Sequence, residues 1–257
     1  MNSIETVGEL LKRCGQPDAV LPPTALFNEG WMLRLVLDWA SRHRSAIDAL
    51  SFDEDSTWYS EALLGSRFRP RKRGDSGGEG FTHADGVIGH FRLRPGGRGD
   101  IELLPGARQL TIVEAKMASG LSTGTKRAPA YNQAARIVAC IAHLLSSGII
   151  DSPTVPNAAF VLVAPAARIA EQTFAALDKA AIAQAVEDRA KQFDAAASEW
   201  CNGCFKPLLA RIRVMAVAWE NILAEICSVD PVAGGQMSEF YSRCLLYNPL
   251  RPSGAAV

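Results

Sequence analysis

The segment TIVEAKM at 111–117 places one acidic and one basic residue at the end of an otherwise apolar run. Side chains alternate along a strand, so Glu114 and Lys116 share one face. Burying a charged group is costly unless it is paired or bound to an ion. The two residues are therefore either a salt bridge at a sheet edge or part of a site that does chemistry. Glu114-Ala115-Lys116 is the only acidic-x-Lys triplet in the chain.

A second carboxylate precedes this segment, in HADGVIG at 83–89. If the two segments pair antiparallel, Asp85 approaches Glu114. Two neighbouring carboxylates repel each other unless a cation lies between them, and oxygen ligands suit Mg²⁺ or Mn²⁺. A bound metal would polarise a phosphoryl oxygen and lower the pKa of a bound water. Lys116 would then position that water or stabilise the charge that grows on the phosphate.

The elements that must hold these residues follow from the hydrophobic pattern. The chain of 257 residues is close to the upper limit for one hydrophobic core. The pattern predicts, in chain order, helices at 1–13, 28–43 and 57–64, extended pieces within 81–94 and 101–117, a helix from 131 and a buried strand at 158–166. Further helices are predicted at about 166–197, 204–227 and 235–246. This order indicates an α/β fold, with a central mixed β-sheet flanked by helices and with N- and C-terminal helical additions.

These motifs resemble the PD-(D/E)XK nuclease superfamily, which has the restriction-endonuclease-like fold. The resemblance rests on Asp85-Gly86, on Glu114-Ala115-Lys116, and on a helix that opens with Tyr131-Asn132-Gln133. It covers roughly 57–165, and Ala84 stands where the family name has proline. The superfamily core runs α-β-β-β-α-β, which implies an N-terminal helical segment over 1–56, a nuclease core over 57–165 and a C-terminal helical extension over 166–257.

The resemblance also implies roles for individual residues. Asp85 and Glu114 would bind Mg²⁺ or Mn²⁺ with the carbonyl of Ala115, and Lys116 would be the catalytic lysine. Gln133 matches a glutamine of the exonuclease-like branch. The acidic residue that many members carry on their first core helix is matched by Glu61. The implied activity is metal-dependent hydrolysis of phosphodiester bonds, with DNA as the expected substrate.

A basic run precedes the first of these carboxylates. Arginine and lysine contacts with phosphates dominate affinity for nucleic acids, so the run is a candidate DNA contact. A solvated loop is the alternative. The net charge of zero argues against a general nucleic-acid coat protein. The candidate contact residues are Arg67, Arg69, Arg71, Lys72 and Arg73, with Lys126 in a later loop.

Each assignment has a simpler alternative. Asp85-Gly86 is also a common turn dipeptide, Glu61 could be a solvated helix residue, and Gln133 could cap its helix. Asp100 is the substitute carboxylate if Asp85 proves distant. At the level of the whole protein, one alternative is an inactive nuclease-fold protein that binds nucleic acid or a protein partner. Another is an unrelated α/β protein with a chance surface pair, which a close approach of Asp85 to Glu114 would argue against.

The remaining expectations concern location and assembly. The chain starts without the basic and apolar segments of a signal peptide and has no apolar stretch of membrane-spanning length. Its six scattered cysteines suit a reducing compartment. We therefore expect a cytoplasmic protein without a membrane partner. A homodimer is compatible with two-strand cutting in this superfamily, although no sequence feature fixes one.

Overall fold

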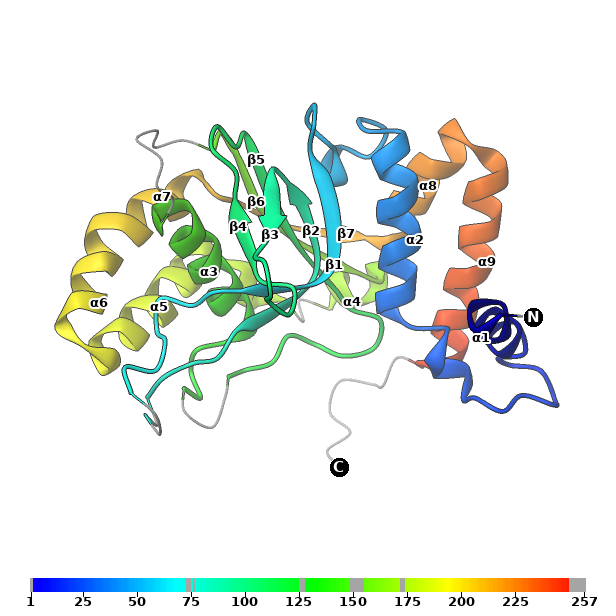
Figure 1. Ribbon diagram of the computed structural model, residues 1–257, viewed down its shortest axis with the longest axis horizontal. Coiled ribbons are helices and arrows are strands. Elements are labelled where there is room, and N and C mark those ends of the chain that lie inside the picture. Colours follow the sequence, from blue (N-terminus) through cyan, green and yellow to red (C-terminus); the bar gives the residue numbers. More distant parts are fainter. Residues whose placement is uncertain are drawn as a thin grey trace.

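The structure is a computed structural model that describes residues 2–72, 75, 77–124, 128–147, 155–171 and 174–249. In this part of the chain, a five-stranded mixed sheet is sandwiched between two layers of helices (Figure 1). The strands are β1 (Thr57–Leu64), β2 (Thr82–Gly89), β3 (Phe91–Leu93), β4 (Ile101–Leu103), β5 (Gln109–Ala115), β6 (Asn157–Ala164) and β7 (Arg213–Ala218). The α-helices are α1 (Ser3–Lys12), α2 (Glu29–Arg42), α3 (Gln133–Ser147), α4 (Ala166–Ala170), α5 (Lys179–Phe193), α6 (Ala195–Trp200), α7 (Lys206–Arg211), α8 (Trp219–Val229) and α9 (Pro231–Tyr247).

The strand order of the main sheet is β1-β2-β5-β6-β7. β1, β2 and β5 are antiparallel, whereas β5, β6 and β7 are parallel. Every residue of β5 is buried, because this strand is central and both of its faces are covered. The antiparallel pairing of 83–89 with 111–117, on which the approach of Asp85 to Glu114 depended, is present, with Gly86 opposite Val113. The predicted fold class, a mixed sheet flanked by helices, is confirmed.

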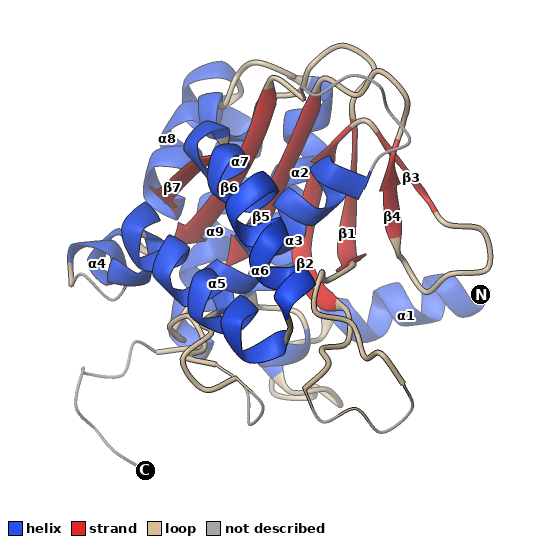
Figure 2. Cartoon of the chain, turned by 90° about the vertical axis from the view of Figure 1, so that its left-hand side faces the viewer, coloured by secondary structure: helices blue, strands red, loops and turns tan. Residues whose placement is uncertain are grey.

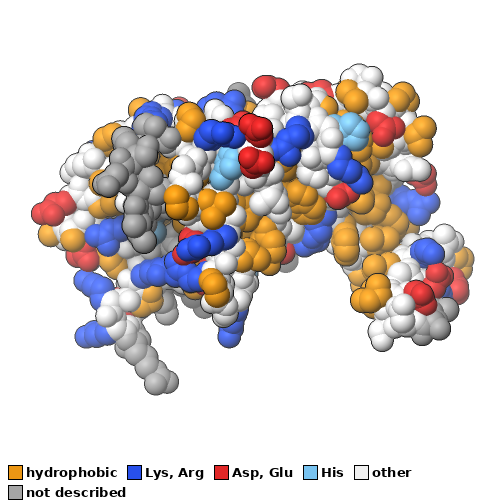
Figure 3. Space-filling view, turned by 45° about the horizontal axis from the view of Figure 1, so that its top comes forward, with side chains coloured by type: hydrophobic (Ala, Val, Ile, Leu, Met, Phe, Trp, Pro, Cys, Tyr) orange, Lys and Arg blue, Asp and Glu red, His pale blue; other side chains and the backbone are white. Residues whose placement is uncertain are grey.

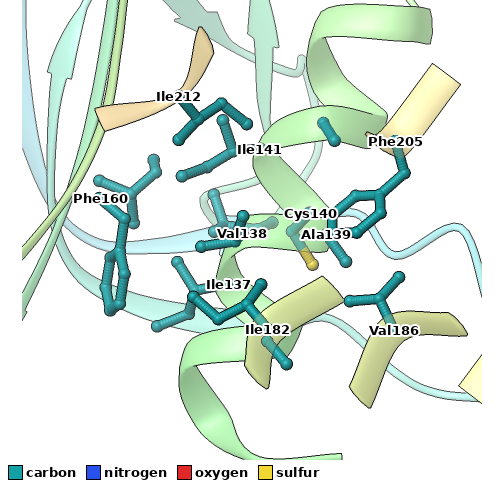
Figure 4. Packing of buried hydrophobic residues seen from close by; sticks show 14 of the residues in the cluster. Ile137, Val138, Ala139, Cys140, Ile141, Phe160, Ile182, Val186, Phe205 and Ile212 are labelled. Atoms are coloured by element: carbon teal, nitrogen blue, oxygen red, sulfur yellow. The ribbon is translucent and has the colours of Figure 1, made fainter. Parts of the chain in front are cut away.

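Two hydrophobic cores lie on the two faces of the sheet. On one face, α3 packs between the sheet and the helices α5 to α7. Figure 4 shows Ile137 and Ile141 of α3 among residues of β6, α5 and the segment before β7. On the other face, α2, α8 and α9 cover β5 and β6. Asn28 caps α2 by accepting a hydrogen bond from the amide of Trp31 at 3.0 Å, and the helix then buries a Met-Leu and a Val-Leu pair one turn apart.

Two sequence predictions are wrong. The segment 57–64 is the strand β1 and not a helix, since seven of its residues pair with β2. A segment of eight residues with mixed apolar spacing fits either period, and pairing with a neighbouring strand decides between them. The predicted helix over 204–227 is interrupted by β7, which adds a parallel edge strand beside β6. The observed order α2, β1, β2, β5, α3, β6 is still α-β-β-β-α-β, but it begins with α2.

A short hairpin lies along the outer edge of β1. β3 and β4 pair antiparallel and are joined by the turn at 94–100 (Figure 2). The amide of Leu63 in β1 donates a hydrogen bond to the carbonyl of Gly99 at 2.9 Å, and Leu63 forms an isolated parallel bridge with Asp100. The hairpin therefore covers part of an edge that would otherwise present unpaired backbone groups.

The surface is mixed in charge. On the face shown in Figure 3, basic side chains lie in small groups beside acidic ones rather than in one continuous patch. Within the described residues, no helix has the length and apolar character needed to cross a membrane.

Candidate active site

Glu114 lies at the end of β5 and is almost completely buried, with 2% of its surface exposed. One of its oxygens, Oε1, accepts hydrogen bonds from Lys116 Nζ and from Gln133 Nε2, both at 2.5 Å. The other oxygen, Oε2, is buried and receives no hydrogen bond from an amide, hydroxyl or ammonium group of the described residues, and the carboxyl group of Asp85 lies within hydrogen-bonding reach of Glu114. An unpaired buried carboxylate oxygen is costly, so this atom is suited to share a proton with Asp85 or to bind a cation.

Asp85 lies on the neighbouring strand, β2. The pairing of β2 with β5 ends at Gly86 and Val113, one residue short of Asp85 and Glu114, and the negative charge of Asp85 acts on Glu114. Asp85 Oδ2 accepts a hydrogen bond from the amide of Ala115 at 2.8 Å. The structure therefore brings together Asp85, Glu114, Lys116 and Gln133. Asp100, the substitute carboxylate, lies instead at the hairpin beside β1.

Glu61 is on β1, not on a helix as predicted. Its backbone has φ of 57°, in the left-handed region that residues other than glycine seldom adopt. At this residue the alternation of side chains between the two faces of the sheet is interrupted. Ser60 accepts a hydrogen bond from Arg34 of α2, whereas Ala62 packs in the core on the opposite face, although residues two apart normally share a face.

The same interruption occurs in β2, at the residue that faces Glu61. Gly86 lies against leucine side chains of α2, whereas Ala84 packs in the core beside α3. The register Ser60–Gly86 and Ala62–Ala84 places Glu61 opposite Asp85, at the centre of this double distortion. Glu61 and Asp85 therefore occupy facing positions on β1 and β2, at the residues where both strands are distorted. Strained backbone of this kind is often found at functional sites.

The electrostatics of the site favour neutral carboxyl groups in the absence of a cation. Burial, followed by the negative charge of Asp85, raises the pKa of Glu114 to about 7. Burial also raises the pKa of Asp85, and the charge of Glu61 acts in the same direction. Lys116 opposes both shifts. A divalent cation between the carboxylates would offset the repulsion that one lysine leaves uncompensated.

The donor set at this point suits a hard cation. The carbonyl of Ala115 leaves β5 on the same side as its amide, which faces Asp85, because both groups of one residue point toward one neighbouring strand. Two carboxylates and one carbonyl are oxygen ligands of the kind that Mg²⁺ and Mn²⁺ prefer. The described residues contain no group of three or more His, Cys, Asp or Glu arranged to hold a metal.

The backbone of Lys116 is fixed from two sides. Its amide donates a hydrogen bond to the carbonyl of Val163 on β6 at 2.8 Å. Its carbonyl accepts a hydrogen bond from the indole Nε1 of Trp219 at 3.0 Å. Trp219 is fully buried and begins α8, which follows β7. The C-terminal part of the chain thus holds the lysine in place.

The first turn of α3 is tied to the loop after β5. Gln133 donates its backbone amide to the carbonyl of Ser122 at 2.9 Å, and its side-chain oxygen accepts the amide of Ser122 at 3.2 Å. Arg136, one turn later, donates to the hydroxyl of Ser122 at 3.1 Å. These contacts direct the amide group of Gln133 toward Glu114. The simple helix-cap alternative does not account for that orientation.

The candidate DNA-contact residues are not equivalent. Arg69 and Lys72 are exposed and Arg67 is half-buried. Arg71 pairs with Asp75 at 3.1 Å and stacks over Phe193 at 4.9 Å, so its guanidinium already has partners. Arg73 and Lys126 lie outside the described residues.

A buried ion pair anchors this basic loop to the C-terminal helices. Arg189 of α5 contacts Glu79 at 2.7 Å, and only 3% and 11% of the two side chains are exposed. The guanidinium of Arg189 also lies 5.1 Å from the ring centre of Phe68. Ser66 donates its hydroxyl to the second oxygen of Glu79 at 3.0 Å. The loop is therefore held at both of its ends.

Sequence reasoning missed two residues that shape the site. Arg34 of α2 contacts the carboxylate of Glu61 at 3.0 Å. Trp219 holds the carbonyl of Lys116, as described above. No local signal marks either residue, since their spacing is that of ordinary amphipathic helices and their partners lie far away in the sequence.

Comparison of the chain with protein-family models, with curated proteins and with solved structures gives no match. The site is therefore interpreted from its own geometry.

Proposed function

We propose that the chain is a metal-dependent nuclease that hydrolyses phosphodiester bonds in DNA. The observation that carries the proposal is the arrangement around Glu114. Asp85 lies within hydrogen-bonding reach of it, Lys116 and Gln133 both bind its Oε1, and its buried Oε2 receives no hydrogen bond from an amide, hydroxyl or ammonium group of the described residues. A chance surface pair would be neither this buried nor this completely surrounded.

Each residue then has a defined task. Asp85, Glu114 and the carbonyl of Ala115 would hold Mg²⁺ or Mn²⁺, which when bound supplies a polarised phosphoryl oxygen and an acidified water. Gln133 and Lys116 both bind Oε1 of Glu114, so Oε2 would be the oxygen available to the cation. Lys116 orients the attacking water or stabilises the negative charge that develops on the phosphate. Glu61 adds a carboxylate at the solvent side of the site.

The test is a cleavage assay with Mg²⁺ on linear and circular DNA. We expect cutting by the parent protein, its loss with a chelator, and a decrease of roughly 100-fold or more in Lys116→Ala, because a positioned proton-transfer or charge-stabilising group typically contributes that much. Lys12→Ala is the control, since that lysine is 73% exposed on α1.

Two results would contradict the proposal in different ways. Equal cutting by the parent and Lys116→Ala would assign the activity to another site or to a contaminant. If the parent does not cut DNA but Mg²⁺ raises its melting temperature, and Asp85→Asn abolishes that shift, the metal site is retained and the DNA substrate is wrong.

A further inference from the structure

A pocket of about 670 Å³ opens beside Glu61, between β1, the start of β2 and the turn of the β3–β4 hairpin. Glu61 belongs both to this pocket and to the distorted rung that carries Asp85. An occupant would therefore lie next to Glu61, one strand away from Asp85. The lining residues are Glu61, Leu63, Phe81, His83, Arg98 and Asp100, together with Gly96 and Gly97.

The hairpin wall of this pocket is held in place. Leu63 and Gly99 share the hydrogen bond described above, and the amide of Arg94 donates to the carbonyl of Asp100 at 2.8 Å. A Cβ added at Gly97 would lie 3.0 Å from the Asp100 carboxylate. The absence of side chains at Gly96 and Gly97 keeps this wall flat, so that a planar group can approach the backbone closely.

Phe81 provides an aromatic surface inside the pocket. It is 44% exposed, which is unusual for a phenylalanine next to a folded sheet. The guanidinium of Arg69 lies 5.3 Å from the ring centre, and Phe81 is one of the residues that line the pocket. A base in the pocket would stack on the exposed part of this ring. Base–aromatic stacking is the usual way in which proteins bind unpaired bases.

The charges in the pocket select for the same occupant. The pocket is lined by two acidic residues, Glu61 and Asp100, and by two basic residues, Arg98 and His83. It is therefore not a basic groove of the kind that binds the two phosphate backbones of duplex DNA. A neutral base that donates hydrogen bonds from its amino group to Asp100 suits these charges. In a paired and stacked duplex, both faces of each base are covered and the amino groups are engaged.

We propose that this pocket binds one unpaired nucleotide of the substrate next to the bond that is cut, with its base stacked on Phe81. The assignment rests on the proposed nuclease function and narrows the substrate to DNA with a single-stranded end or an extruded base. Cytosine, adenine and guanine carry an amino group that would donate a hydrogen bond to Asp100, whereas thymine does not.

The test is equilibrium binding of a fluorescein-labelled oligodeoxycytidylate and of a blunt duplex hairpin, measured by anisotropy with Ca²⁺ in place of Mg²⁺. In Phe81→Ala we expect the affinity for the oligodeoxycytidylate to fall about tenfold and the affinity for the blunt duplex to stay nearly constant, because only the unpaired base loses its stacking partner. Phe81→Trp should retain binding. Leu93→Ala is the matched control, since Leu93 is 42% exposed on the same hairpin but does not line the pocket.

The proposal is overturned if Phe81→Ala binds the oligodeoxycytidylate as the parent does, if it loses affinity equally for both DNAs, or if the parent does not bind the oligodeoxycytidylate. None of these results depends on cutting. The nuclease proposal is tested separately by Lys116→Ala and Mg²⁺, so a failure of the pocket and a failure of the nuclease assignment are distinguishable.

Discussion

Replacing Glu114 with glutamine should change how the stability of the metal-free protein depends on pH. The carboxyl group is buried, and burial together with the charge of Asp85 raises its pKa from 4.5 to about 7. In the unfolded chain the group is surrounded by water. The folded state therefore binds its proton more tightly than the unfolded state, and the free energy of unfolding falls as the pH rises through the interval between the two pKa values.

The size of the effect follows from the same values. Below pH 4.5 both states are protonated and the penalty is absent, whereas above pH 7 it is complete at roughly 3 kcal/mol. Most of this penalty develops between pH 5 and pH 8. Glu114→Gln has no proton to lose at this position, so the part of the pH slope that belongs to Glu114 disappears.

The assay is urea unfolding followed by tryptophan fluorescence at several pH values between about 5 and 8, with a chelator present. The quantity compared is the change of unfolding free energy with pH, because a constant loss from the altered contacts with Lys116 cancels in that difference. Glu54→Gln is the control for net charge, since its side chain is 84% exposed. Parallel pH curves for the parent and Glu114→Gln would refute the reasoning about burial. If the curves differ as expected, Mg²⁺ at pH 8 should stabilise the parent and not the variant.

Three further outcomes are expected. Trp219→Phe keeps an aromatic ring but removes the hydrogen bond to the carbonyl of Lys116. DNA cutting should therefore fall several-fold, whereas the rise in melting temperature that Mg²⁺ causes should not change. An equal loss of both would indicate general unfolding. Glu61→Gly should be about 1 kcal/mol more stable in urea unfolding than Glu61→Ala, because φ of 57° favours glycine, and the reverse order would disprove the strain. Arg189→Ala should lower the free energy of unfolding by roughly 3 kcal/mol, because Glu79 is then buried without its partner. Arg189→Met should cost the same if loss of the charge is the cause. Full recovery of stability by methionine would instead assign the effect to packing.

The sequence was most informative where local pattern and burial agree. β5 and β6 could be predicted because an apolar run of strand length admits few other structures in a core of this size. The antiparallel approach of Asp85 to Glu114 followed from the position of each residue relative to its strand.

Prediction failed where distant partners decide. The segment 57–64 carries apolar residues at spacings that fit a helix, and its strand structure depends on β2. Glu61 was selected for a place on a helix, yet it lies opposite Asp85 through a distortion that only the paired strands reveal. β7 could not be recognised in the sequence as a separate strand, because the segments on both sides of it strongly favour helix. The contact of Trp219 with Lys116 joins residues that no local pattern relates.

That last contact has a consequence for the order in which the protein matures during synthesis. The ribosome releases Asp85, Glu114 and Lys116 well before β7 and α8, because chains emerge from the N-terminal end. Until then β6 has an open parallel edge, and the carbonyl of Lys116 lacks the indole that fixes it. A growing chain can thus form the pair of carboxylates early, but the lysine reaches its final position only after α8 has emerged.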